Sequence, residues 1–276
     1  MTYCISDIHG CFPELMQLLE KINFNENDTL YVLGDIIDRG DYSLECLKFV
    51  YSMPNIKCLL GNHEIMMLDY FDIYPSHCSL HIPNANVDVW LSQGGDKTLS
   101  QINQAKKQSD SKEEWYKILD WVKSLPTYAE VAINGTDYLL SHAGFDVSKS
   151  LSMQWLSDLT WSRDEFYKNP GFDGKCCVFG HTPTSLLHEH NIKDNSFWHD
   201  PKYEDKIGID CGCVFGGLLG ALCLDTEDEI YVAALSGWER LKYAWKTASI
   251  SEKLLTAAAI GGVIVGGILL SKNEFE

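Results

Sequence analysis

Five short apolar segments of this chain each run into a polar turn that contains glycine together with Asp, His or Asn. In chain order the turns read "SDIHG", "GDIIDRG", "GNHE", "HAG" and "FGHTP". Glycine lets the backbone turn sharply after a strand. In open α/β folds, ligand sites form where the carboxyl ends of neighbouring strands meet. The five turns therefore favour an α/β fold that brings their side chains together at the ends of strands.

The first sixty residues alternate between the two kinds of regular structure. Apolar residues at Leu15, Leu18, Leu19 and Ile22 follow helical spacing, and Pro13 suits the first turn of a helix. Strand, helix, strand, helix and strand are expected in turn at 2–6, 13–22, 29–33, 43–52 and 55–60. This order predicts an α/β fold with neighbouring strands joined by crossover helices.

The rest of the chain is expected to add helices and then further strands. Residues 65–128 are predicted to be mostly helical, and "NGTD" at 134–137 is a hairpin signal. Strands are predicted at 130–133, 136–141, 176–180, 206–211, 220–225 and 229–235.

The charge of the chain narrows the classes of partner. The chain of 276 residues has 39 acidic and 22 basic side chains, which gives a formal net charge of −17. General nucleic-acid binding depends on basic side chains that neutralise phosphates, so no nucleic-acid partner is expected. Converging carboxylates would instead favour a bound cation.

The cysteines and the N-terminus indicate a reducing compartment. Ten cysteines are present, and none forms a CxxC pair. Most have apolar neighbours, so we interpret them as reduced core residues. The start of the chain, "MTYCISDIHG", has no basic region or long apolar run, which favours the cytoplasm over secretion.

The C-terminal tail differs in composition from everything before it. Residues 254–270, "LLTAAAIGGVIVGGILL", are uncharged and apolar, and a Lys lies on either side of them. We expect a catalytic domain over 1–239, a basic linker over 240–253 and a membrane-anchor helix over 254–271. The Gly262–Gly266 spacing would allow two such helices to pair as a homodimer. A buried helix or a disordered tail is the alternative.

The polar residues in the five turns are suited to binding a metal. Each motif alone is weak, because a single His or Asp after a strand is usually structural. Together they offer oxygen and nitrogen donors, which suit Mn²⁺, Fe or Zn²⁺ better than a thiolate site would. The other histidines are interpreted as surface or core residues: His77, His81, His188, His190 and His199.

In these motifs the chain resembles the PPP-type metallophosphatases among the calcineurin-like metallophosphoesterases. The bacterial and phage branch is most similar, through "WLSQGGDKTL", "TWSRDEF", "VFGHTP" and "IGIDCGCVFGGLLGAL". The resemblance runs from about residue 2 to residue 236. It implies a β-sandwich flanked by helices and two divalent metal ions, with Mn²⁺ expected and Fe or Zn as alternatives.

The resemblance also implies a role for each matching residue. Asp7 and His9 would hold the first metal ion, and Asp35 would bridge the two ions. The second ion would be completed by Asn62, His142 and His181.

Four further residues match the catalytic positions of the family. His63 would protonate the leaving group, and Asp38 would orient His63. Arg39 and Arg163 would bind phosphate together with Asn62, since a guanidinium fork fits phosphate oxygens. For Arg163 the alternative is a surface salt bridge with Asp164 or Glu165.

Three functions follow from the resemblance. "GHTP" lacks the second His of the phosphodiesterase "GHxH" motif, which favours phosphomonoester or pyrophosphate cleavage. "GNHE" and "WSR" favour a serine/threonine phosphoprotein phosphatase as the main prediction. The alternative is a symmetrical dinucleoside tetraphosphatase or another small-molecule phosphate hydrolase. A catalytically dead, membrane-tethered binding module is the third and weakest possibility, because every metal position is filled.

Overall fold

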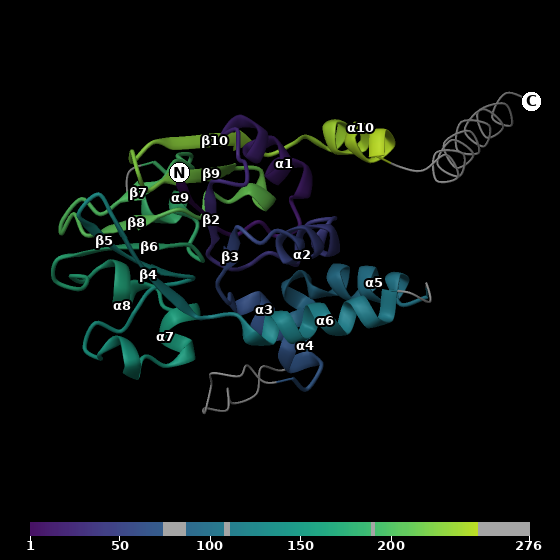
Figure 1. Cartoon of the computed structure of the whole chain (residues 1–276), viewed down its shortest axis with the longest axis horizontal. Coiled ribbons are helices and arrows are strands. Elements are labelled where there is room, and N and C mark those ends of the chain that lie inside the picture. The colour runs from purple at the N-terminus through teal and green to yellow at the C-terminus, as the bar shows by residue number, and fades with distance from the viewer. Residues whose placement is uncertain (74–86, 108–110, 189–190, 248–276) are drawn as a thin grey trace, which may run out of the picture. The chain divides into compact units, whose positions relative to one another are not determined.

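Two five-stranded sheets carry the fold in the computed structural model, which describes residues 1–73, 87–107, 111–188 and 191–247 (Figure 1). The first sheet has the order β10-β9-β1-β2-β3, and the second has the order β4-β5-β6-β8-β7. The first sheet consists of β1 (Thr2–Ile5), β2 (Thr29–Val32), β3 (Ile56–Cys58), β9 (Leu218–Cys223) and β10 (Glu229–Ala233). The second consists of β4 (Tyr128–Ile133), β5 (Thr136–Ser141), β6 (Lys175–Phe179), β7 (Trp198–His199) and β8 (Lys206–Gly208).

The predicted alternation of strands and helices at the start of the chain is confirmed. β1, β2 and β3 pair in parallel, and they are joined by α1 (Phe12–Lys21) and α2 (Ser43–Ser52). Each element begins and ends within one or two residues of its predicted position. Parallel pairing brings the turns after β1, β2 and β3 to the same edge of the sheet.

The predicted hairpin is also confirmed. β4 and β5 pair antiparallel, and Ile133 lies opposite Thr136 across a two-residue turn. Asn134 and Gly135 both have positive φ, at 51° and 89°, which is the backbone that two-residue hairpin turns favour.

The two sheets pack face to face. Successive side chains along a strand point alternately toward the other sheet and toward the outer helices. On β1, Tyr3 and Ile5 pack against the helices, whereas Cys4 packs against the second sheet. On β5, Leu140 faces the first sheet and Leu139 faces the opposite layer. The chain is therefore an α/β fold of two mixed sheets flanked by helices, as the sequence predicted.

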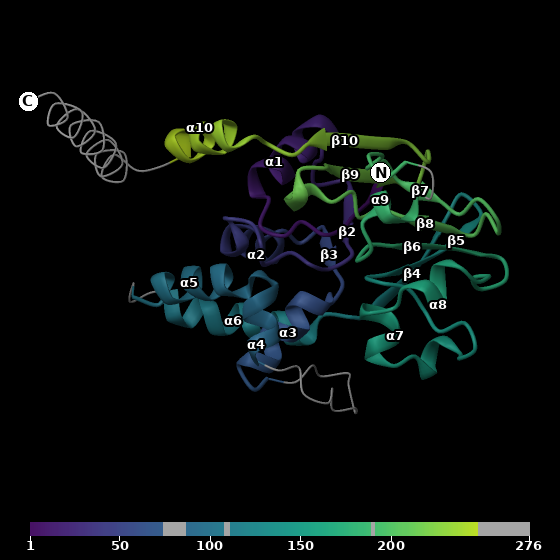
Figure 2. The same cartoon turned by 180° about the vertical axis from the view of Figure 1, so that it is seen from behind.

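Helices cover the outer faces of both sheets. The region predicted to be helical forms α3 (Asn62–Tyr70), α4 (Val87–Trp90), η1 (Leu91–Gly95), α5 (Asp96–Ala105) and α6 (Ser111–Ser124). The other layer has η2 (Leu151–Met153), α7 (Leu156–Thr160), α8 (Asp164–Tyr167) and α9 (Thr184–Leu187), and η3 (Cys213–Phe215) precedes β9. In Figures 1 and 2, α7 and α8 lie on the opposite side from α5 and α6.

A glycine allows the two sheets to meet closely next to β6. A Cβ atom on Gly180 would lie 2.0 Å from Ser6 Oγ and 2.3 Å from Asp7 Oδ2. Any side chain at this position would push apart the turns after β1 and β6. The "FGH" sequence thus places His181 directly beside Asp7.

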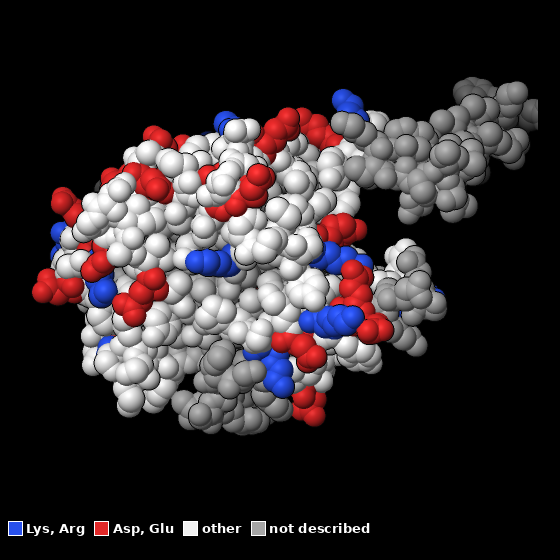
Figure 3. All heavy atoms as spheres, viewed as in Figure 1, with Lys and Arg blue, Asp and Glu red and all other residues white. Residues whose placement is uncertain are grey.

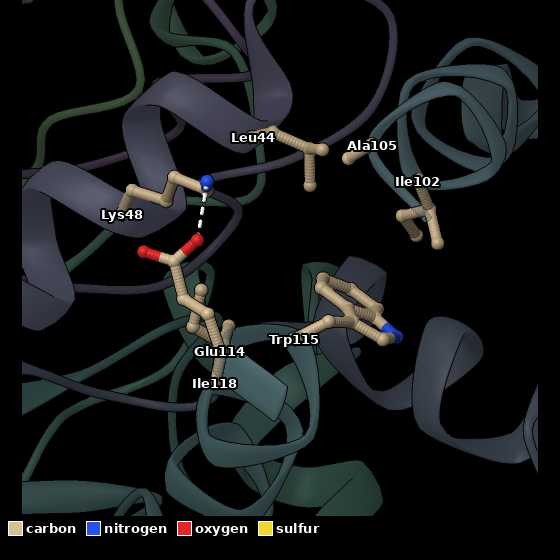
Figure 4. A pocket seen from close by; sticks show the side chains of 7 residues that line it. All are labelled: Leu44, Lys48, Ile102, Ala105, Glu114, Trp115 and Ile118. Atoms are coloured by element: carbon tan, nitrogen blue, oxygen red, sulfur yellow. Dashed lines mark hydrogen bonds and ion pairs between the residues drawn. The ribbon is translucent and has the colours of Figure 1, made fainter. Parts of the chain in front are cut away.

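A small cavity between α2, α5 and α6 lies outside these turns (Figure 4). Its volume is about 10 Å³, enough for at most one water molecule. The Lys48 Nζ and Glu114 Oε2 atoms pair across its edge at 2.6 Å. This cavity is a packing gap among helices and holds none of the predicted site residues.

The acidic composition is visible on the surface. In Figure 3, acidic side chains lie along the upper and left edges and at the right, and several basic side chains lie beside them. The nine cysteines that the structure describes form no disulfide, and most are buried, as predicted.

The chain divides into two units, Met1–Ala234 and Leu235–Glu276. In the second unit α10 (Gly237–Thr247) is described, so the first part of the predicted linker 240–253 is helical. The predicted membrane segment 254–271 lies outside the described residues, and both it and the pairing of tails remain predictions. Within the described ranges, no helix is long and apolar enough to cross a bilayer.

Candidate metal centre

The turns after β1, β2, β3, β5 and β6 bring the six predicted metal ligands into one closed ring of contacts. His9 Nε2 lies 3.9 Å from Asp7 Oδ1 and 3.4 Å from Asp35 Oδ2. The ring continues through Asp35 Oδ1 to His142 Nε2 at 3.4 Å, and then to Asn62 Oδ1 at 2.8 Å. Asn62 Oδ1 is 3.0 Å from His181 Nδ1, and the amide of His181 donates to Asp7 Oδ2 at 3.0 Å. All six residues are buried.

The backbone of these turns is in an uncommon conformation. Six of the predicted site residues have φ between 45° and 74°: Asp7, His9, Asp35, Asp38, Arg39 and His181. Such backbone costs a non-glycine residue about 1 kcal/mol or more. Left-handed backbone concentrated in this way marks a functional site, because the surrounding structure has to maintain it.

Two histidines of the ring have their tautomers fixed by the backbone. His142 Nδ1 lies 2.9 Å from the carbonyl of Leu33, and His9 Nδ1 lies 2.8 Å from the carbonyl of Ile37. A carbonyl only accepts, so Nδ1 must donate in both rings. Burial lowers the pKa of both imidazoles, so each is neutral and its Nε2 atom carries a lone pair.

The lone pair of His142 faces other acceptors, because its Nε2 atom points at oxygens of Asn62 and Asp35. His9 Nε2 faces the carboxylates of Asp35 and Asp7, and it is also in contact with the guanidinium of Arg39, which can donate to it. Acceptors that face one another at these distances repel unless a cation lies between them. The same arrangement, with Nδ1 bound to a backbone carbonyl, is typical of metal-bound histidine. The donor set therefore fits divalent metal ions.

Carboxylates are crowded in the same place. Burial raises the pKa of Asp35 well above its usual value, and the nearby Asp7 and Glu64 raise it further. Burial and Asp7 likewise raise the pKa of Asp210. Ionised carboxylates so close together are costly without a positive charge. Two overlapping groups of three possible ligands share Asp35, namely His9, Asp35 and His63, and Asp35, His142 and His181.

Asp210 was missed as a site residue by the sequence analysis. It follows β8 in "IGID", its Oδ1 accepts the amide of Gly212 at 2.9 Å, and its side chain is buried beside Asp7. Its position after an apolar strand was the same signal that identified the other turns.

Glu64 has a role that the motif "GNHE" did not reveal. Its carboxylate accepts the amides of Asp35, Ile36 and Gly61 at 2.8, 2.9 and 3.1 Å. The side chain is fully buried and faces the backbone of the turn after β2. Glu64 therefore shapes the turn that carries Asp35.

His63 is held against Asp38, as the resemblance implied. His63 Nδ1 lies 2.6 Å from Asp38 Oδ2, and that oxygen also accepts the indole N–H of Trp90 at 2.7 Å. Thr98 Oγ1 donates to the second oxygen at 2.6 Å. Burial raises the pKa of Asp38 to about 7, and these two donors oppose the increase. The His63 ring is thus oriented with Nε2 toward Asp35, 3.8 Å from Oδ2.

The two predicted phosphate arginines lie at different parts of the ring. Arg39 contacts His9 through Nη1, and Arg163 Nη1 donates to Thr182 Oγ1 at 3.2 Å, directly after His181. Both side chains are partly exposed. For Arg163 the structure shows this hydrogen bond to the "HTP" turn.

The spare histidines within the described residues lie outside the ring. His188 Nε2 is 3.2 Å from the carbonyl of Ser196, and the exposed His199 pairs with Glu229 at 2.6 Å. His77, His81 and His190 lie outside the described residues.

The chain belongs to the calcineurin-like phosphoesterase family, whose model matches residues 2–217. This is the class that the two mixed sheets and the ring of Asp, His and Asn ligands define. Members of this family bind divalent metals, and the ring offers the donors for them.

Curated relatives share one name. A symmetrical bis(5'-nucleosyl)-tetraphosphatase from Buchnera aphidicola is 29% identical over 280 residues, which cover 82% of this chain and 95% of the relative. A protein of the same name from Haemophilus ducreyi is 51% identical over 69 residues, which cover 24% of this chain and 26% of the relative.

Solved structures share the fold. A candidate diadenosine tetraphosphatase superposes with a TM-score of 0.56 at 20% identity, over 86% of this chain and 94% of the other. A protein serine/threonine phosphatase from Saccharomyces cerevisiae gives a TM-score of 0.50 at 18% identity, over 85% and 79%. At these identities the likeness shows the fold and does not separate the two substrates.

We expect the Asp35→Asn substitution to have opposite effects on thermal stability with and without bound metal. In chelator, Asp35→Asn should raise the melting temperature, because it removes one of the crowded carboxylates. With Mn²⁺ the wild type should be more stable, by about 2.7 kcal/mol over its metal-free form at 100 times the dissociation constant. Thermal unfolding of both proteins, with and without Mn²⁺, measures this.

The matched control is Asp164→Asn, which removes an exposed carboxylate that pairs with Lys168. It should gain as much from Mn²⁺ as the wild type does. A wild type whose melting temperature does not respond to Mn²⁺, Fe²⁺ or Zn²⁺ would contradict a metal centre in this ring.

Proposed function

We propose that this protein hydrolyses dinucleoside tetraphosphates symmetrically, which yields two nucleoside diphosphates. The observation that carries the proposal is the similarity to a symmetrical bis(5'-nucleosyl)-tetraphosphatase over 95% of that protein's length. The alternative from the sequence is thus better supported than the phosphoprotein phosphatase that was the main prediction.

The placement of the arginines supports a polyphosphate substrate. Arg39 lies at the His9 side of the ring, and Arg163 lies at the His181 side. Guanidinium forks at two parts of the ring can each hold phosphate oxygens, as a substrate with several phosphates would require.

The residues divide the reaction among them. Two divalent ions held by the ring would supply positive charge to the phosphoryl oxygens and a readily deprotonated water. In the hydrolysis a water oxygen bonds to an inner phosphorus, the bridging P–O bond opposite it breaks, and the substrate separates into two nucleoside diphosphates. Arg39 and Arg163 hold the phosphates in line, and His63, oriented by Asp38, delivers a proton to the departing oxygen.

Of the two motifs that favoured a phosphoprotein substrate, "GNHE" owes its Glu to the shape of the turn after β2. Glu64 of "GNHE" is fully buried and binds the amides of the turn after β2. A residue in this position sets the shape of the metal centre for any substrate. The Glu of "GNHE" therefore does not by itself favour a protein over a nucleotide as the substrate.

The proposal predicts the products of one reaction. The full chain loaded with Mn²⁺ should convert diadenosine tetraphosphate to ADP alone, as followed by chromatography. A phosphothreonine peptide assayed beside it should release phosphate at a much lower kcat/KM.

His63→Ala serves as the control, and it should lower the dinucleotide rate by about 100-fold or more. This loss would show that the activity belongs to the chain. Formation of ATP and AMP would contradict symmetrical cleavage. If the dinucleotide is not cleaved while the peptide releases phosphate, the phosphoprotein phosphatase becomes the better-supported function.

The role of Glu64 gives a separate prediction. Glu64→Asp shortens the carboxylate that holds the Asp35 turn, so it should lower the rates on the dinucleotide and on p-nitrophenyl phosphate by the same factor. Steady-state kinetics with both substrates measure the ratio. A change of that ratio by more than about three-fold would show that Glu64 does select the substrate.

A further inference from the structure

Two exposed aromatic rings contact residues of the metal centre. Phe215, at the end of η3, is 66% exposed, and Trp161, directly after α7, is 41% exposed. Neither ring has a role in the chemistry described above.

Phe215 accompanies the first arginine. The guanidinium carbon of Arg39 lies 5.3 Å from the centroid of the Phe215 ring, within the range of a cation–π contact. Two glycines with positive φ, Gly212 at 65° and Gly216 at 92°, bound the short helix that carries the ring. Asp210 accepts the amide of Gly212, so the loop is anchored at the metal centre. The ring is thus held in place while it remains open to solvent.

Trp161 accompanies the second arginine. Its ring lies 5.8 Å from the ring of His181, nearly perpendicular to it at 78°. Arg163 follows two residues later and donates to Thr182 beside His181. Trp161 therefore lies next to His181, whereas Phe215 lies next to Arg39, which contacts His9.

Each of the two arginines is thus accompanied by an exposed aromatic ring, Phe215 beside Arg39 and Trp161 beside His181 and Arg163. A dinucleoside polyphosphate likewise has a base at each end of its phosphates. Stacking of a base on an aromatic side chain tolerates any base, because every base has a π-face. A phosphopeptide carries no such pair of planar groups around its phosphate.

We propose that Phe215 and Trp161 are stacking surfaces for the two nucleobases of the substrate, one at each end of the polyphosphate. This inference rests on the proposed function and adds the residues that recognise the nucleoside ends. It also gives a physical reason why the substrate would be a dinucleotide rather than a bare polyphosphate.

The test compares a substrate that has bases with one that lacks them. Phe215→Ala and Trp161→Ala are assayed in the full chain with Mn²⁺, on diadenosine tetraphosphate and on inorganic tripolyphosphate. Each variant should raise KM for the dinucleotide by about 5- to 150-fold, which corresponds to the loss of one stacked base. The increase in KM for tripolyphosphate should be at least five-fold smaller. Phe215→Trp, which keeps an aromatic ring, should have the wild-type KM for the dinucleotide.

Trp155→Ala is the matched control. Trp155 is 55% exposed, and its ring packs on Lys149 at 3.8 Å rather than on a residue of the centre. This variant should leave the KM for both substrates unchanged.

The outcomes distinguish the stacking proposal from the proposed function. If Phe215→Ala and Trp161→Ala leave the dinucleotide KM unchanged, or affect both substrates equally, the stacking proposal is overturned while the dinucleotide activity stands. If the wild type itself does not cleave the dinucleotide, the proposed function fails, and the stacking proposal fails with it.

Discussion

The repulsion among acceptor atoms in the ring is the constraint on which the rest of the site depends. The backbone carbonyl of Leu33 fixes His142 as a neutral ring whose Nε2 lone pair faces the oxygens of Asp35 and Asn62. A folded chain maintains such an arrangement only if other interactions offset its cost. Bound cations remove the repulsion, so the stability of the site and its function depend on the same ions.

Much of the surrounding structure serves to hold this ring. Gly180 allows the turns after β1 and β6 to touch, and Glu64 binds the amides of the turn that carries Asp35. Around His63, the carboxylate of Asp38 is itself held by Trp90 and Thr98. Side chains fixed in this way lose little freedom when a substrate binds, which is the condition for efficient positioning of reacting groups.

The sequence predicted the parts of the site that depend on local order. Apolar strands followed by short polar turns placed the ligands at strand ends, and those after β1, β2 and β3 meet at one edge of the first sheet because parallel strands end together. His142 and His181 follow strands of the second sheet, which packs against the first. The sequence did not predict contacts between distant segments. Trp90 and Thr98 reach Asp38 across 52 and 60 residues, from helices whose own pattern shows only ordinary packing. The same limit explains the interpretation of Glu64, since only the folded chain shows that its carboxylate turns inward.

The substrate was the least predictable feature for a related reason. The metal centre is compatible with several phosphate substrates, and the fold alone is shared with phosphatases of proteins and of nucleotides. Selection lies in groups outside the ring, where exposed side chains such as Phe215 carry little signal in one sequence. Local pattern therefore identifies the chemistry of this family before it identifies the substrate.

The most direct test of the metal centre is anomalous diffraction from crystals of the full chain grown with Mn²⁺. The account predicts two anomalous peaks inside the ring, one near Asp7 and His9 and the other near Asn62, His142 and His181, with Asp35 between them. A ring without peaks, in which the Asn62 amide nitrogen donates to His142 Nε2, would contradict it. That result would show that hydrogen bonds within the protein, rather than cations, satisfy these buried donors and acceptors.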